Sequence, residues 1–196
     1  MSVHQNLAGQ AIGGRAADLP IKIGLGVAGA LLLAVSAQLK VQLGPVPFSF
    51  QTLVLLLIAA SYGRNLAVGT VLGYFAMGVA GLPVFAGGVG PLTFLGTTGG
   101  FLAGFLPCAA IVGAAADRGL DRSALTLAPA MLAGTVVLFA MGWAWLAFAA
   151  TLSSGSTGAG MGNAWAWGVQ PFIIGDLLKI AIAALAIPAG WTLLKR

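Results

Sequence analysis

Two oppositely charged residues, Asp176 and Lys179, interrupt an otherwise apolar stretch near the end of the chain. Their three-residue spacing places both side chains on one face of a helix. Counted from Pro171, they lie roughly 8–12 Å below the start of that helix, at about 1.5 Å per residue. A charge at this depth in a membrane is costly and usually functional. The carboxylate can accept hydrogen bonds from ligand N–H groups, and the ammonium can donate to a carbonyl or carboxylate. The structural alternative is a neutralised ion pair that locks the helix against its neighbours.

A glycine-rich segment, Gly96-Thr97-Thr98-Gly99-Gly100, precedes another apolar stretch. Unpaired amides at a helix N-terminus can hold an anionic ligand group, and the glycines allow close approach of the backbone. An N-cap formed by Thr97 or Thr98 explains the same residues equally well. The segment therefore adds Thr98, Gly99 and Gly100 as candidate ligand contacts.

The segment 45–52 combines two prolines, two aromatic rings and two polar side chains at the expected start of a helix. It is either a ligand-contacting segment or a stiff connection in which Thr52 caps the helix. Tyr74 lies in a later apolar stretch, where its hydroxyl needs a hydrogen-bond partner. Such a tyrosine is more often a hydrogen-bonding residue of the core than a ligand contact. Phe48, Gln51, Thr52 and Tyr74 complete the set of candidate ligand contacts.

Several classes of function lack the residues that they need. The sequence has no phosphate-binding loop of the form Gly-x-x-x-x-Gly-Lys-Ser/Thr, so it does not predict ATP binding by this chain. His4 and Cys108 are its only histidine and cysteine, which excludes a His or Cys metal site and a Ser–His catalytic pair. The basic residues are scattered, which argues against nucleic-acid binding. We therefore predict a binding protein that is not an enzyme and has no metal or cofactor of its own.

The composition indicates an integral membrane protein. Apolar residues make up 59% of the chain and charged residues only 7%, whereas soluble domains carry roughly 25% charged residues. A membrane span needs about 20 residues, so the chain is long enough for six. We predict an all-α, multi-pass protein of the cell membrane (plasma or inner), with residues 1–19 as a cytoplasmic tail and residues 20–196 as a six-helix domain. The expected spans cover about 21–39, 48–61, 66–81, 99–116, 124–150 and 171–194.

The positive charges predict the orientation of these spans. With the N-terminus inside, seven of the nine basic residues fall on the inner side, and both termini are cytoplasmic. These residues are Arg15, Lys22, Arg64, Arg118, Arg122, Lys195 and Arg196. The outer side then receives two long, uncharged segments, 82–98 and 151–170, which we expect to be loops that cap or gate the site.

Small residues recur every four positions in the first span, at Gly26, Ala30 and Ala34. This spacing places them on one helix face, where another helix can approach closely.

Four segments together resemble a known family. They are Pro-Val-Pro-Phe-Ser-Phe-Gln-Thr-Leu at 45–53, Gly-Leu-Pro-Val-Phe-Ala-Gly-Gly at 81–88, Gly-Thr-Thr-Gly-Gly-Phe-Leu-Ala-Gly-Phe at 96–105 and Pro-Phe-Ile-Ile-Gly-Asp-Leu-Leu-Lys at 171–179. In order and spacing they resemble BioY, the biotin-specific substrate-binding (S) component of energy-coupling factor (ECF) vitamin transporters. The likeness covers residues 20–195, although Thr97 stands where the family usually has proline.

The resemblance implies the six-helix fold of ECF S components and capture of biotin from the outer face. It implies that Asp176 and Lys179 contact biotin, that Phe48 or Tyr74 encloses its rings, and that the face of Gly26, Ala30 and Ala34 docks on a partner. The implied partners are a transmembrane coupling subunit and a pair of ABC-type ATPases, which alone use ATP. Other readings are an S component for a related vitamin or biotin precursor, a structural membrane protein, a transporter that acts alone, and a homo-oligomer.

Overall fold

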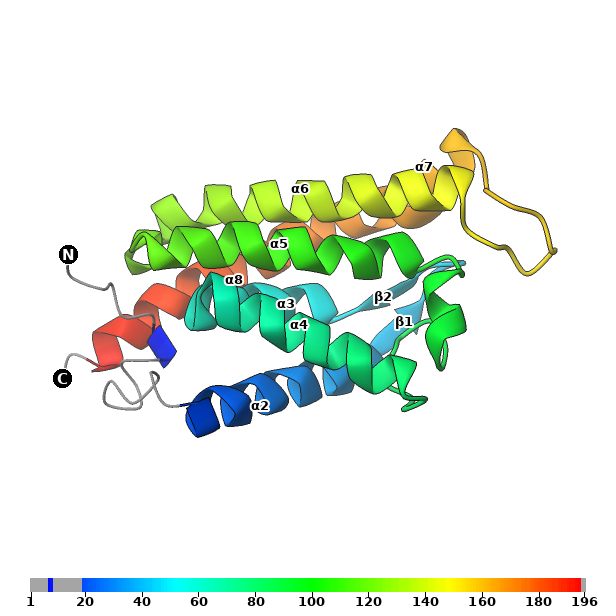
Figure 1. Cartoon of the computed structure of the whole chain (residues 1–196). Coiled ribbons are helices and arrows are strands. Elements are labelled where there is room, and N and C mark those ends of the chain that lie inside the picture. Colours follow the sequence, from blue (N-terminus) through cyan, green and yellow to red (C-terminus); the bar gives the residue numbers. More distant parts are fainter. Residues whose placement is uncertain (1–6, 9–18, 195–196) are drawn as a thin grey trace.

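The computed structural model describes residues 7–8 and 19–194 and is mostly helical (Figure 1). Six long helices and one short helix follow one another along the described chain. They are α2 (Leu19–Gln38), α3 (Gln51–Tyr62), α4 (Arg64–Val79), α5 (Gly99–Asp117), α6 (Ala124–Phe148), α7 (Met161–Gly168) and α8 (Ile173–Leu194). Two short strands, β1 (Lys40–Gln42) and β2 (Pro47–Ser49), pair antiparallel between α2 and α3. Short 3₁₀ turns occupy Pro91–Phe94, Leu120–Arg122 and Gln170–Phe172.

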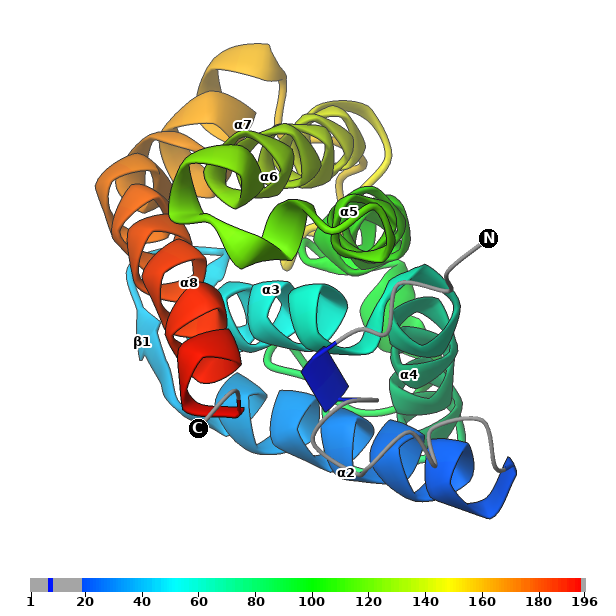
Figure 2. The same cartoon turned by 90° about the vertical axis from the view of Figure 1, so that its left-hand side faces the viewer.

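Helix α3 lies at the centre of the bundle. Seen from the end of the molecule, it is surrounded by α2, α4, α5 and α8, while α6 packs outside against α5 and α8 (Figure 2). Its position explains its composition, since Leu55, Leu56, Ala59 and Ala60 are all buried. In the first turn of α3, Gln51 is also buried, whereas Thr52 is half-buried.

Glycines allow α5 and α6 to pack unusually closely. A Cβ atom at Gly104 would lie 2.9 Å from the Cα atom of Leu138, and one at Gly142 would overlap the ring of Phe101. Small residues of this kind let helix backbones approach each other in membrane proteins. The close pair holds Leu138 and Phe101 against the centre of the bundle.

The β-hairpin and the loop between α4 and α5 lie at one end of the bundle, opposite the end where α2 begins and α8 ends (Figure 1). Two hydrogen bonds join them: Thr97 Oγ1 donates to the carbonyl of Pro45 at 2.8 Å, and Lys40 Nζ donates to that of Ala86 at 2.6 Å. A third joins the end of α2 to the same loop, from Gln38 Nε2 to the carbonyl of Pro83 at 3.1 Å. The two segments together cover the start of α3. The helix ends that carry Lys22, Arg64, Arg118 and Arg122 lie at the opposite end.

The helices agree with the expected spans in position, although not all of them in length. By length and composition, four stretches of the described chain could cross a membrane: Leu19–Gln38, Gly99–Asp117, Ala124–Phe148 and Met161–Leu193. Helices α3 and α4 have only 12 and 16 residues. The count of six spans and the sidedness of the termini stay predictions. The expected tail, 1–19, lies almost wholly outside the described residues.

Two connecting segments contain regular structure that the sequence did not predict. Residues 40–49 form the β-hairpin, and part of 151–170 forms α7. Gly160, with a φ of 78°, turns the chain into α7, and Trp143 Nε1 donates to the carbonyl of Met161 at 3.2 Å. Helix α7 is therefore fixed to α6 by a long-range contact, which the local glycine-rich sequence did not indicate.

Candidate ligand-binding site

The core of the site is the ion pair between Asp176 and Lys179 in the first turns of α8. Lys179 Nζ lies 3.1 Å from Asp176 Oδ1, and the two residues are only 3% and 5% exposed. The three-residue spacing thus brings both side chains to one helix face, as the sequence predicts. Because few ions are buried without compensation, the groups that surround the pair decide its role.

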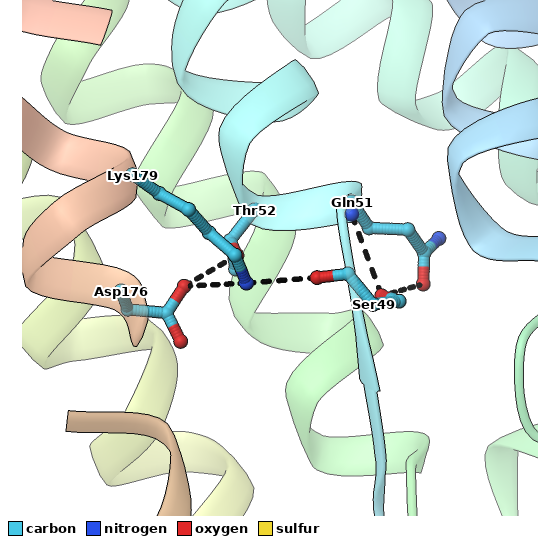
Figure 3. A network of polar contacts seen from close by, with 5 residues as sticks. All are labelled: Ser49, Gln51, Thr52, Asp176 and Lys179. Carbon is cyan, nitrogen blue, oxygen red and sulfur yellow. Dashed lines mark hydrogen bonds and ion pairs between the residues drawn. The ribbon is translucent and has the colours of Figure 1, made fainter. Parts of the chain in front are cut away.

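The ammonium group of Lys179 has three acceptors in the structure. It donates to the carbonyl of Ser49 at 2.7 Å, to Thr52 Oγ1 at 2.9 Å and to Asp176 Oδ1 (Figure 3). An ammonium group has three donor hydrogens, so every one of them is used. A ligand acceptor must therefore take the place of one of these contacts.

Thr52, in the first turn of α3, joins both charged groups. Its hydroxyl donates to Asp176 Oδ1 and accepts from Lys179 Nζ (Figure 3). Thr52 is therefore a bridge between α3 and α8. The structure gives it this role in place of the helix cap that the sequence left open, since α3 has no side-chain cap hydrogen bond.

The second carboxylate oxygen of Asp176 differs from the first. Asp176 Oδ2 is buried and has no hydrogen-bond partner among the described residues. A buried acceptor without a donor is costly, and Asp176 lines a cavity. The arrangement leaves one strong acceptor open to an N–H or O–H group of a ligand.

The cavity beside the pair is small and has walls of mixed polarity. Its volume is about 60 Å³, measured as the space that the centre of a water molecule can occupy. Its polar lining comes from Ser49, Gln51, Thr52, Thr98, Asp176 and Lys179. Its apolar lining comes from Val46, Pro47, Ala86, Gly87, Phe101, Leu102, Phe105, Leu138, Phe139 and Phe172.

A row of four aromatic rings runs along the site. Phe48 packs on Phe172 with ring centroids 5.6 Å apart, Phe172 on Phe139 at 5.8 Å, and Phe139 on Phe101 at 5.9 Å. Phe48 also lies against Lys179, whose Nζ is 4.0 Å from the ring centroid. Aromatic faces of this kind suit both a cation and a flat or bicyclic ligand.

Gln51 and Tyr74 form a support behind the cavity. Gln51 Nε2 donates to the Tyr74 hydroxyl at 2.8 Å, and that hydroxyl donates to the carbonyl of Val84 at 3.0 Å. Tyr74 is fully buried and does not line the cavity, whereas Gln51 does. Tyr74 therefore positions Gln51 and the 82–98 loop, which corresponds to the core role that the sequence left open.

The two glycines at the start of α5 serve helix packing. A Cβ atom at Gly99 would overlap the carbonyl of Phe94, and one at Gly100 would overlap Trp145. The amide of Gly99 donates to the carbonyl of Gly96 at 3.2 Å, so it is not free to hold an anionic group. Thr98 lines the cavity and makes no cap hydrogen bond.

The face of small residues on α2 packs mainly inside this chain. Ala30 and Ala34 are 2% and 9% exposed, and α2 packs on α3 and α4. Gly26 lies at the edge of a groove between α2 and α4. In this conformation the close approach that the spacing predicts is made within the chain, and Gly26 and Ala30 border the open groove.

The sequence did not single out Phe101, Phe139, Phe172 or the carbonyl of Ser49 as part of the site. Phe172 follows Pro171 in the same segment as Asp176, which was the available signal. Phe101 and Phe139 lie in helices with many apolar residues, where no local pattern separates them from packing residues. In the described part of the chain, no three His, Cys, Asp or Glu side chains gather as a metal site would require.

Comparisons with known proteins agree with one another. The model of the BioY family matches residues 14–196. The chain is 34% identical to a probable biotin transporter BioY of Pyrococcus horikoshii, over 79% of this chain and 86% of that protein. It is 36% identical to a biotin transporter BioY of Rhodobacter capsulatus, over 82% of this chain and 87% of that protein.

One solved structure shares the fold. It is the S-component for biotin from an ECF-type ABC transporter, with a TM-score of 0.72 over 87% of this chain and 90% of that chain. The two sequences are 19% identical. At this identity the likeness establishes the arrangement of the helices and not the chemistry of the site.

Proposed function

The chain belongs to the BioY family, and we propose that it is the biotin-binding S component of an ECF-type transporter. The match covers nearly the whole chain, and the relatives are biotin transporters by name. The fold is that of a biotin S-component. The protein thus captures a vitamin for uptake and does not catalyse a reaction.

The observation that carries the proposal is the open acceptor at Asp176 Oδ2 beside the buried Lys179. The ureido ring of biotin has two N–H groups and one carbonyl. The N–H groups donate to the Asp176 carboxylate, and Lys179 donates to the ureido oxygen or to the valerate carboxylate. Because the pair is neutral as a whole, the site gains a specific set of donors and acceptors without a net buried charge.

The remaining contacts shape the site around this pair. Thr52 and Gln51 line the polar side, Phe48 packs against Lys179, and Thr98 contributes a hydroxyl to the cavity wall. Tyr74 acts through Gln51 without a ligand contact. The packing of Gly99 and Gly100 against α6 supports a positioning role for both glycines.

The fold also supports the wider transport assembly that we propose. Six helices cross the cell membrane with both termini in the cytoplasm, and the hairpin and the 82–98 loop face outward. The charged turns at the opposite end match the positive-inside rule. A transmembrane coupling subunit, with a pair of ABC-type ATPases that hydrolyse ATP, docks on the surface that begins at Gly26.

A binding measurement tests the function directly. The purified protein in detergent should retain labelled biotin, and unlabelled riboflavin or thiamine should not displace it. Asp176→Asn and Lys179→Ala should each lower biotin affinity by at least about tenfold, the loss of about one hydrogen bond to a charged group. Leu125→Ala, at a surface position that is 87% exposed, is the control and should bind as the wild type does. Wild-type affinity in both site variants would place the site elsewhere.

A further inference from the structure

The cavity beside Asp176 and Lys179 is too small for a vitamin. Its volume of about 60 Å³ has room for a few water molecules, at about 10–15 Å³ each in this measure. Ligand pockets are usually roughly 300–1,000 Å³. A bicyclic ligand with a side arm therefore needs displacement of the cavity walls or space beyond them.

A groove between α6 and α8 adjoins the cavity and supplies that space. It has a volume of about 500 Å³ in the same measure. Asp176 and Phe139 line both the cavity and the groove, so these two side chains form the wall between them. Phe139 is half-buried and makes two tilted or edge-on ring contacts, with Phe172 and Phe101. The ring of Phe139 therefore separates the groove from the cavity, and its displacement would join the two spaces.

The groove has almost entirely apolar walls that reach the surface of the helix bundle. Leu132, Val136 and Leu177 are 45%, 58% and 52% exposed. Trp143 and Trp165 line it as well, at the end of the bundle that carries α7. An alkyl chain fits such walls, since the transfer of CH₂ groups from water to an apolar surface is favourable.

Two buried polar atoms mark the groove as more than a packing defect. Thr135 lines it and is 5% exposed, and its hydroxyl has no partner among the described residues. The other is the open carboxylate oxygen of Asp176, a residue that lines both the groove and the cavity. A threonine hydroxyl can donate to a carbonyl oxygen, so an ester or amide group beside Thr135 would satisfy it.

The charge at the groove restricts which kind of ligand side arm can enter it. Among the described residues, Asp176 is the only ionisable one that lines the groove, while its partner Lys179 does not line it. A carboxylate placed there would meet the carboxylate of the pair and not its cation, between apolar walls. A neutral ester or amide avoids this repulsion. We therefore expect the free acid of biotin to keep its carboxylate out of the groove.

We propose that the α6–α8 groove is a side pocket of the binding site that takes the neutral, mainly alkyl arm of biotin esters and amides, with Phe139 as the movable wall. The substrate class is thus biotin together with its neutral conjugates. This inference rests on the proposed biotin-binding function, because the ureido ring must first be held at Asp176.

Binding of biotin and of its N-hexyl amide to the protein in lipid nanodiscs tests the side pocket. The wild type should bind the amide within about tenfold of biotin, a difference of about 1.4 kcal/mol or less. Ala140→Trp fills the groove from an exposed position of α6 that does not line the cavity. It should weaken the amide at least about tenfold and leave biotin unchanged. Ala144→Trp, exposed on the same helix and outside the groove lining, is the matched control and should change neither ligand.

The outcomes separate this inference from the proposed function. Failure of the wild type to bind biotin would overturn both. Biotin binding with rejection of the amide would overturn the side pocket alone, as would equal effects of Ala140→Trp and Ala144→Trp on the amide. Loss of both ligands in Ala140→Trp would also overturn it, because the groove would then serve the whole site and not the arm. Phe139→Ala, which removes the wall, should favour the amide over biotin more than the wild type does.

Discussion

Removal of Lys179 alone should destabilise the protein far more than removal of Lys179 and Asp176 together. In Lys179→Met the carboxylate keeps its Thr52 hydrogen bond but loses its counter-ion inside the bundle. In the double variant Asp176→Leu/Lys179→Met, apolar side chains of similar size replace both charges. A buried pair can often be exchanged for apolar residues at little cost, whereas one isolated buried charge is costly.

The structure sets the magnitude. At the observed 3.1 Å, two unit charges attract each other by about 5 kcal/mol at an effective dielectric constant of about 20. Loss of one partner of a buried pair costs about 3–5 kcal/mol in measured cases. In a chain of this length each kcal/mol lowers the Tm by about 2–4 °C. We therefore expect Lys179→Met to lower the Tm by about 6–20 °C, and the double variant to stay within about 4 °C of the wild type.

The assay is thermal unfolding in detergent, followed by the fluorescence of the five tryptophans. Labelled biotin binding is measured on the same samples. Lys22→Met, which removes an exposed cation, is the control and should shift the Tm by no more than about 2 °C. The double variant should be folded and should fail to bind biotin, because its donors and acceptors are gone.

Two results would refute this reasoning. A double variant as unstable as Lys179→Met would mean that the polar contacts, and not the unpaired charge, determine stability. A stable double variant that still binds biotin would show that the pair is a structural lock, the alternative that the sequence left open.

Three further predictions concern the surroundings of the pair. Thr52→Val should weaken biotin binding by at least about tenfold, since each hydrogen bond to a charged group contributes about 1.5–3 kcal/mol. Thr52→Ser keeps the hydroxyl and should bind biotin as the wild type does. Equal biotin affinity of the two variants would contradict the bridging role. In Gly175→Ala, the new Cβ atom would lie 2.5 Å from Cζ of the Phe48 ring and should push that ring away from Lys179. Biotin affinity should therefore fall below that of the wild type, with little loss of Tm. Burial raises the pKa of Asp121, while the Trp191 hydrogen bond opposes this effect. The folded state thus holds the Asp121 proton more tightly, and stability falls as the pH rises through the raised pKa. Asp121→Asn should therefore gain Tm relative to the wild type between pH 4 and pH 7, and a constant difference would contradict the burial argument.

The spacing of charges was the part of the site that the sequence could predict. Asp176 and Lys179 are three residues apart in a helix, and helix geometry alone makes them neighbours. Their rarity in an apolar chain marked them as functional. Gln51 and Thr52 were predicted because they are polar side chains at the start of a helix, and both line the cavity in the structure.

Long-range packing decided the rest. Phe139 reaches the cavity only because the glycines of α5 and α6 bring those helices together, and no local pattern records which of many aromatic residues faces inward. The same packing explains the small size of Gly99 and Gly100, which leaves room for Phe94 and Trp145. A glycine-rich helix start therefore indicates an anion site and a close helix contact equally well until the neighbouring helix is known.

The shortness of α3 explains why the site lies where it does. Its 12 residues cover about 18 Å at 1.5 Å per residue, whereas the hydrocarbon core of a membrane is about 30 Å thick. In the six-span arrangement that we propose, the remaining depth falls to the hairpin and the 82–98 loop. Irregular backbone is tolerated at such depth only where protein buries it or where it lines a cavity. The carbonyl of Ser49 meets this requirement by accepting from Lys179. A short central helix thus creates both the space for a ligand and the unpaired backbone groups that a buried cation can satisfy.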